Sequence, residues 1–151
     1  MTVVREARSS DLGSIVTLLL DLPKGTDYEG LSVDTNKMRE FLAAMLDTPA
    51  GKVLVLERDD QIAGVLIGSC QEWWFGHDLL ASVMTLYVAP SARSGVFIKR
   101  MVERFETWAV NCGATRVMLG VSSGAAVERK GHLLGHFGYK ASGGLYTKDV
   151  G

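Results

Sequence analysis

Apolar residues recur every three or four positions in four stretches of the chain, a spacing typical of amphipathic helices. The predicted helices cover residues 9–22, 34–46, 96–112 and 125–136. Ser9 or Ser10 is expected to cap the first helix and Asp34 the second, because their side-chain oxygens accept hydrogen bonds from free backbone N–H groups. Gly113 and Gly138 are expected to end the third and fourth helices.

Short runs of β-branched and other apolar residues between these helices predict strands. They are expected at residues 2–6, 53–57, 62–69, 83–88, 117–121 and 145–148, with a further short strand at 139–141. The pair Asp59-Asp60 predicts a hairpin turn, and Trp73-Trp74-Phe75-Gly76 predicts a loop. The longest helix joins the strand at 83–88 to a buried strand at 117–121. We therefore expect a parallel crossover and an α/β (α+β) fold.

The composition is that of an ordinary globular protein, with 47% hydrophobic and 22% charged residues in a chain of 151. This length predicts one domain over residues 1–151. A net charge of −1 indicates no basic surface for nucleic acid. The longest apolar run, Val16–Leu20, is too short to span a membrane, and Arg5, Glu6 and Arg8 interrupt any leader segment. We expect neither nucleic acid nor a membrane as a partner.

The cysteines and histidines do not predict a metal site. Cys70 and Cys112 lack metal-binding or redox spacing, which favours reduced, buried thiols in a cytoplasmic protein. Glu128, His132 and His136 follow one another at intervals of four residues, a spacing that places metal ligands on one helix face. The zincin order of histidine and glutamate is missing, and no strong third ligand is evident, so no metal is expected.

The most informative stretch is the strand at 83–88, which runs through Pro90 and the loop Arg93-Ser94-Gly95 into the longest helix. The first N–H groups of a helix have no partners within it, and the helix dipole places partial positive charge there. With an arginine beside it, this junction is a candidate site for an anion such as a phosphate.

Four segments, taken in order, resemble the GNAT N-acetyltransferase superfamily over nearly the whole chain. They are residues 3–12 (VVREARSSDL), 86–93 (LYVAPSAR), 106–114 (ETWA, then GA) and 136–146 (HFGY, then GLY). The resemblance implies a central mixed sheet whose fourth and fifth strands splay apart, with helices on both faces. No single segment is specific to the family, but the order and spacing of the four segments are.

The same resemblance implies acetyl-CoA as the donor and a primary amine as the acceptor. Backbone groups of Leu86, Tyr87 and Val88 are the expected contacts of pantetheine. The pyrophosphate is expected on the loop and first helical turn, formed by Arg93, Ser94, Gly95 and Val96. A backbone N–H of the strand, such as that of Tyr87 or Val88, is expected to stabilise the oxyanion.

The sequence departs from the family pattern at four positions. Val96 and Ile98 stand where small residues are usual in the cofactor loop, Ser82 where many members have a general-base Glu, and Leu134 where many have a general-acid Tyr. The proton-transfer candidates are therefore a water chain or one of Glu72, His77, Asp78, His132 and Tyr139, of which Glu72, His132 and Tyr139 are the leading ones. The departures also leave open an alternative, a non-catalytic GNAT-fold binding or dimerisation module with or without bound CoA.

Two further segments bear on the partners. In the family the loop between the first two helices shapes the acceptor side, and here it spans Pro23–Val33 with Asp27, Tyr28 and Glu29. Acidic residues there suit a cationic amine, although a solvated loop explains them equally well. The aromatic run Trp73-Trp74-Phe75 fits an acceptor-site wall, a homodimer contact or core packing of at least one ring.

Overall fold

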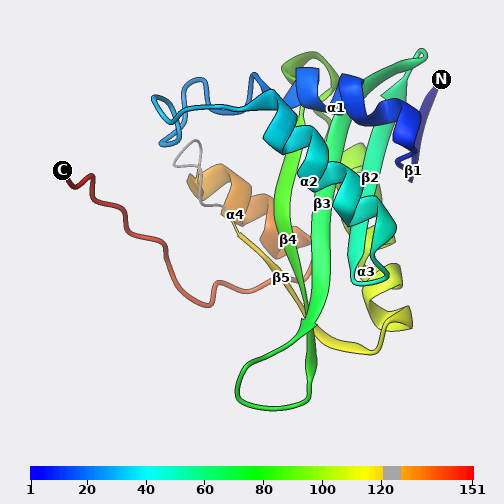
Figure 1. The fold of residues 1–151 in the computed structure, drawn as a ribbon. Helices are drawn as coiled ribbons and strands as arrows, with labels where there is room; N and C mark the ends of the chain where they lie inside the picture. Colours follow the sequence, from blue (N-terminus) through cyan, green and yellow to red (C-terminus); the bar gives the residue numbers. More distant parts are fainter. Residues whose placement is uncertain (121–126) are drawn as a thin grey trace.

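A five-stranded mixed sheet forms the centre of the computed structural model, which describes residues 1–120 and 127–151 (Figure 1). The strands are β1 (Thr2–Glu6), β2 (Gly51–Arg58), β3 (Gln61–Glu72), β4 (Leu79–Val88) and β5 (Ala114–Leu119). The α-helices are α1 (Leu12–Leu19), α2 (Thr35–Asp47), α3 (Gly95–Asn111) and α4 (Val127–His136), with 3₁₀ turns η1 (Ser9–Asp11) and η2 (Pro90–Ala92). The strands lie in chain order, antiparallel from β1 to β4 and parallel between β4 and β5.

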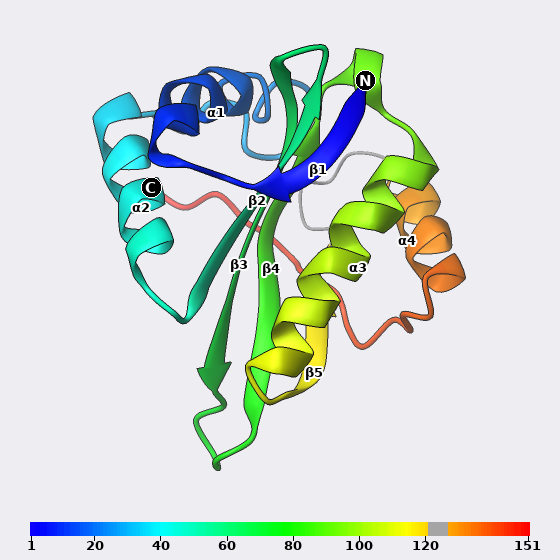
Figure 2. The same cartoon turned by 90° about the vertical axis from the view of Figure 1, so that its right-hand side faces the viewer.

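Helices cover both faces of the sheet, α1 and α2 on one and α3 on the other (Figure 2). The alternation of side chains along the strands creates the two cores. Leu54 and Leu66 pack on the α3 side, whereas their neighbours Val55 and Val65 pack on the α1 and α2 side. The mixed sheet with helices on both faces is confirmed. No helix among the described residues has the length and apolar character needed to cross a membrane.

The loop chemistry of the sequence predicts several turns correctly. Asp59 and Asp60 both have positive φ, 50° and 63°, as the two-residue turn of the β2–β3 hairpin requires. Asp34 caps α2 by accepting a hydrogen bond from the Lys37 N–H. Gly113, with φ 91°, ends α3, and Gly138, with φ 90°, follows α4.

The fourth and fifth strands separate partway along β4. Pairing with β5 runs from Leu79 to Val83, whose partner is Leu119, while β4 continues to Val88. Met84, immediately after the last pair, is an extra residue in the β3–β4 register, where Ile67 pairs with Thr85 and Gly68 with Val83. Because such a bulge bends and twists its strand, it accounts for the predicted splay. Among the described strands, β3 alone accompanies β4 beyond this point.

The start and end of the first predicted helix are wrong in detail. Neither Ser9 nor Ser10 is the cap, because both lie within η1, and the Asp11 carboxylate accepts from the Arg8 N–H instead. The α-helix ends at Leu19 rather than Leu22. Tighter turns follow, in which each N–H donates to the carbonyl three residues earlier.

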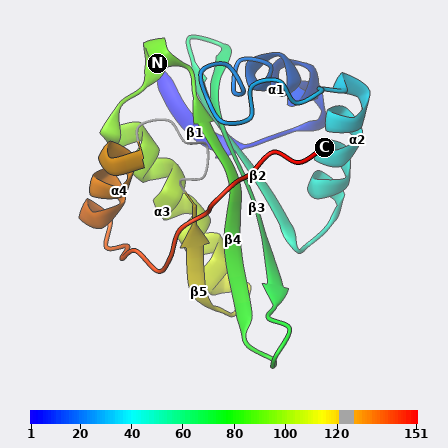
Figure 3. The same cartoon turned by 90° about the vertical axis from the view of Figure 1, so that its left-hand side faces the viewer.

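The strand predictions near the C-terminus are also wrong. The predicted buried strand at 117–121 forms at Ala114–Leu119 and is half exposed, because β5 is an edge of the sheet; Val121 lies outside the described residues. Residues 139–141 and 145–148 form no strand, and the segment after α4 runs as an exposed coil (Figure 3). Gly143 and Gly144 favour this coil over a strand. Residues 125 and 126 of the fourth predicted helix lie outside the described residues, and the helix runs from Val127 to His136.

A largely buried ion network ties β1 to η1 and β2. The Arg5 guanidinium donates to both Asp11 carboxylate oxygens at 2.8 and 3.0 Å and to Glu57 Oε2 at 2.8 Å. These hydrogen bonds from Arg5 hold the pKa of the buried Asp11 carboxyl below its ordinary value of 3.8. The network therefore fixes the entry into α1 as long as Asp11 is ionised.

We expect Asp11→Asn to lower the free energy of unfolding by about 2–3 kcal/mol at pH 7, because Arg5 loses a charged partner. The folded-state pKa of Asp11 is depressed, so its stabilisation is complete above pH 3.8 and is lost as the pH falls through the folded-state value. Urea unfolding at pH 7 and pH 3 checks this. The difference in unfolding free energy between Asp11→Asn and the parent chain should narrow at pH 3. The exposed-loop control Asp27→Asn should have the same stability as the parent chain at both pH values.

Gly68 is a second position at which the structure predicts how a substitution changes stability. A Cβ built there lies 2.3 Å from Phe105 Cε1 and 2.8 Å from the Ser82 carbonyl oxygen. We expect Gly68→Ala to destabilise the chain by about 1–3 kcal/mol in denaturant unfolding. The matched control is Gly131→Ala in α4, where no atom lies within 4 Å and the helix should gain about 0.5–1 kcal/mol. Equal stability of the two variants would contradict the close packing of α3 on β3.

Candidate functional site

The candidate site lies where β4 passes the end of β5 and enters α3. The Ala89 N–H donates to the Ala63 carbonyl on β3 at 2.8 Å. Because backbone groups alternate in direction along a strand, the N–H groups of Leu86 and Val88 face the opposite side, towards the gap beyond β5. The Tyr87 N–H faces β3, so of the two N–H groups expected to stabilise an oxyanion, that of Val88 has the suitable direction.

Arg93 is folded back onto the end of β4. Its Nε donates to the Val88 carbonyl at 2.8 Å, and its guanidinium carbon lies 5.7 Å from the centre of the Tyr87 ring. The arginine therefore fixes the loop between η2 and α3 in addition to supplying positive charge. The sequence predicts Arg93 as a site residue, but nothing in the sequence indicates its contact with Val88.

The first turn of α3 presents backbone donors to this loop. The Ser94 side chain makes no capping hydrogen bond, and the first N–H accounted for within the helix is that of Ile98, which donates to the Ser94 carbonyl. A Cβ built at Gly95 would meet only Leu133 of α4, at 3.9 Å. Gly95 thus leaves space beside the donors, whereas the Val96 side chain is 58% exposed next to them.

Positive charge gathers around this helix start. Burial, followed by the charges of Arg93 and Arg129, lowers the pKa of Lys130 on α4 below its ordinary value. Lys130 therefore lies within electrostatic range of Arg93 and of Arg129. Free helix N–H groups, a helix dipole and neighbouring cations are together suited to an anion.

The loop between α1 and α2 reaches the same end of β4. Tyr87 packs against the core under α1 and α2. The pKa of Lys24 in the loop is raised mainly by its hydrogen bond to Asp21, and the Tyr87 side chain lies near enough to add a small effect. Glu29 accepts a hydrogen bond from the Gly25 N–H, so this carboxylate is used within the loop. Asp27 is exposed. The predicted acceptor loop therefore borders the candidate site.

The three leading proton-transfer candidates lie in three different places. Glu72 pairs with Leu79 at the far end of β4, about 30 Å from Val88 at roughly 3.3 Å per residue. There its carboxylate lies 3.3 Å from His77 Nδ1. Trp74 and Phe75 are exposed and pack on one another in the tip of the same hairpin, which projects from the body (Figure 1). None of the three aromatic rings is buried in the core.

His132 lies on α4, closer to the start of α3. Its Nε2 is 3.3 Å from Nε2 of His136, and both residues are exposed. No three histidine, cysteine, aspartate or glutamate side chains gather in a metal-binding group within the described part of the chain, from which the side chain of Glu128 is left out. Ser82 and Leu134 are half-buried and bring no titratable group to the site.

Tyr139 is hydrogen-bonded to Glu106, a residue that no pattern in the sequence singles out. Its hydroxyl donates to Glu106 Oε2 on α3 at 2.8 Å. Burial, together with this hydrogen bond and the Glu106 charge, raises the pKa of Tyr139 above its ordinary value. Glu106 falls on the polar side of the α3 pattern, and its pairing with a residue beyond α4 depends on tertiary structure alone.

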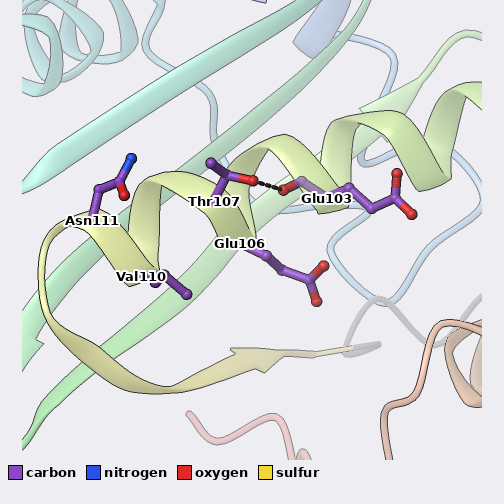
Figure 4. Close-up of a pocket in the computed structure, with 5 residues that line it drawn as sticks. All are labelled: Glu103, Glu106, Thr107, Val110 and Asn111. Carbon is purple, nitrogen blue, oxygen red and sulfur yellow. Dashed lines mark hydrogen bonds between the residues drawn. The ribbon is translucent and has the colours of Figure 1, made fainter.

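One open hollow lies away from the candidate site. It has a volume of about 510 Å³ and is lined by one side of α3, with Glu103, Glu106, Thr107, Val110 and Asn111 (Figure 4). The Thr107 hydroxyl donates to the Glu103 carbonyl, and the Glu103 carboxylate points away from the helix, while the Glu106 carboxylate accepts from Tyr139. This open, acidic surface is a poor match for an anionic ligand, so we base the site on the β4–α3 junction.

The fold is that of the GNAT acetyltransferases. Residues 19–139 match the model of the acetyltransferase (GNAT) family, and the chain belongs to that family. No curated protein sequence matches it.

Three solved structures illustrate the shared fold. Glucosamine-6-phosphate N-acetyltransferase from Arabidopsis thaliana has 15% identity and a TM-score of 0.78, covering 100% of this chain and 99% of its own. A predicted acetyltransferase with acetyl-CoA from Clostridium acetobutylicum has 14% identity and a TM-score of 0.77, covering 99% and 96%. An aminoglycoside acetyltransferase from an uncultured soil sample has 15% identity and a TM-score of 0.74, covering 100% and 99%.

Removing the Tyr139 hydroxyl isolates its contact with Glu106. We expect Tyr139→Phe to lower the free energy of unfolding by about 1 kcal/mol, because a half-buried carboxylate loses its donor. The control is Tyr146→Phe, whose ring is 95% exposed and should cost nothing measurable. In a spectrophotometric pH titration, Tyr139→Phe should remove a late-ionising tyrosine. Loss of an early-ionising one would contradict the raised pKa.

Proposed function

We propose that this chain is an acetyl-CoA-dependent N-acetyltransferase that acts on a primary amine. The observation that carries the proposal is the parting of β4 from β5 beside the N-terminus of α3. This arrangement offers backbone groups of β4 along one side and helix N–H donors with nearby cations at one end. An elongated ligand with an amide-containing arm and an anionic end fits both features.

The residues at the junction suit CoA. The N–H groups of Gly95 and Val96, supported by Arg93, would hold the pyrophosphate, and Leu86 and Val88 would contact the pantetheine arm through their outward backbone groups. Bound acetyl-CoA supplies an acetyl thioester. When an amine attacks that thioester, the Val88 N–H is the group directed to stabilise the oxyanion.

The identity of the residues that transfer the proton is a prediction. A lysine-type amine has a pKa near 10.4, so it must lose a proton before it attacks. We retain Glu72, His132 and Tyr139 as candidates, alongside a water chain, His77 and Asp78. His132 is carried by α4, which also meets the start of α3 through Leu133, and this favours it over Glu72 at the distant hairpin. Tyr139 would act with Glu106 as its partner.

A second function, a non-catalytic binding or dimerisation module, is favoured by specific positions. Val96 places an exposed branched side chain beside the helix donors, and Ser82 and Leu134 supply neither base nor acid. The exposed pair Trp74 and Phe75 supports a homodimer contact better than an acceptor-site wall, since it lies far from the junction.

The loop between α1 and α2 bears on the acceptor class. The exposed Asp27 would favour a cationic amine. Glucosamine phosphate and aminoglycoside enzymes share this fold, so the fold does not select an acceptor. A cytoplasmic location belongs to the same proposal, because both cysteines are free thiols.

Acetyl-CoA binding is the decisive measurement. At a hundredfold excess over Kd we expect stabilisation by about 2.7 kcal/mol, or a Tm higher by roughly 5–10 °C for a chain of this size. Arg93→Glu should weaken the affinity at least about tenfold, because it places negative charge at the helix start. Arg39→Glu, on the exposed side of α2, should bind like the parent chain.

Different results separate the two functions. An unchanged Tm at millimolar acetyl-CoA would refute the transferase. Binding combined with no release of free CoA thiol across a panel of polyamines, amino acids, aminoglycosides and lysine peptides would favour the non-catalytic module. Equal loss of affinity in the Arg93 and Arg39 variants would place the anion site elsewhere.

A further inference from the structure

The two cysteines of the chain meet at the opposite end of α3 from the candidate site. Cys70 is on β3 and is 7% exposed, and Cys112 is the C-terminal capping residue of α3 and is half-exposed. Cys112 packs against the core cluster that contains Cys70. The two thiols come from residues far apart in the sequence and belong to no part of the proposed transfer site.

The register between β3 and α3 brings the thiols together. Phe105 lies directly over Gly68, with a built Cβ only 2.3 Å from the ring. Two residues further along β3, Cys70 points to the same face of the sheet. Two turns further along α3, Cys112 continues the helix stripe that begins at Phe105. From the Gly68–Phe105 contact, β3 and α3 run in the same direction, which agrees with the presence of Cys70 and Cys112 in one core cluster.

The surroundings of Cys70 agree with this placement. Burial is the main cause that raises the pKa of its thiol, and the neighbouring thiol of Cys112 is the other cause. The remaining buried members of the cluster are apolar, for example Leu54, Leu66 and Ala109. In the part of the chain that the structure describes, the thiols of Cys70 and Cys112 therefore lie near each other.

We propose that Cys70 and Cys112 are an oxidation site that forms an intramolecular disulfide with hydrogen peroxide. The Cys112 thiolate, on the accessible side, attacks peroxide and becomes a sulfenic acid with release of one water. The Cys70 thiolate then attacks that sulfur, the S–O bond breaks, and a second water leaves. Two thiols lose two electrons and two protons in total, and one peroxide is reduced to two waters.

The bond would fasten the C-terminal end of α3 to a central strand. It would close a loop that includes β4 and all of α3, and such a cross-link stabilises the folded state relative to the unfolded chain. We expect a rise in Tm of about 5–10 °C on oxidation. The N-terminus of α3 lies about 25 Å away along the helix, so this site is independent of acetyl-CoA binding.

Peroxide treatment of the folded chain, followed by alkylation in denaturant and mass spectrometry, tests the proposal. The expected product is a monomer that is lighter by about 2 Da, takes up no alkyl group and contains one peptide pair joined through Cys70 and Cys112. Dithiothreitol should restore both thiols and the original Tm. Cys112→Ser and Cys70→Ala should each lose the mass change and the Tm rise. Since the Cys112 position is half-exposed, Cys112→Ser keeps the test valid if the buried variant folds poorly.

Four results would count against the proposal. One is oxygen addition at Cys112 with Cys70 still open to alkylation. Another is a disulfide between two chains. The third is that both thiols stay free under conditions that fully oxidise N-acetylcysteine. A joined pair that lowers the Tm would contradict the close approach of the two sulfurs.

Discussion

The packing of Phe105 over Gly68 determines where both ends of α3 lie. The ring occupies the space that any side chain at Gly68 would need, so the helix approaches β3 more closely than a Cβ would allow. Phe105 is fully buried, and the residues one turn on either side, Met101 and Ala109, are buried with it. A helix held this firmly at its middle has its first turn beside the end of β4 and its C-terminal capping residue, Cys112, beside Cys70.

A second constraint acts on the partner strand. The extra residue Met84 bends β4 where its pairing with β5 ends, and Arg93 holds the far end of β4 through the Val88 carbonyl. Between these points β4 keeps outward backbone groups that neither β3 nor β5 uses among the described residues. The bulge therefore creates the gap, and the anchored helix start closes one end of it with N–H donors.

Local patterns in the sequence predicted the elements that local physics determines. Asp34 caps α2 and Asp59-Asp60 forms the hairpin because capping and turn preferences act over a few residues. The strand prediction failed where contacts with distant segments determine the structure. Residues 145–148 have a strand-like composition, but a strand needs a partner, and in this structure the segment has none among the described strands. The loop Arg93-Ser94-Gly95 was recognisable as a candidate site, whereas the pairing of Tyr139 with Glu106 joins distant segments and leaves no trace in the pattern.

The two ends of α3 have opposite chemistry, which keeps their proposed roles separate. The N-terminal end carries unpaired N–H groups and partial positive charge, so anions are favoured there. The C-terminal end carries partial negative charge, so anions are disfavoured there, and burial raises the pKa of the nearby Cys70 thiol. The buried Cys70 thiol therefore reacts slowly, as suits a site that responds to sustained oxidation rather than to turnover. An electrophilic thioester bound at the other end would meet neither thiol, so the amine remains its nucleophile.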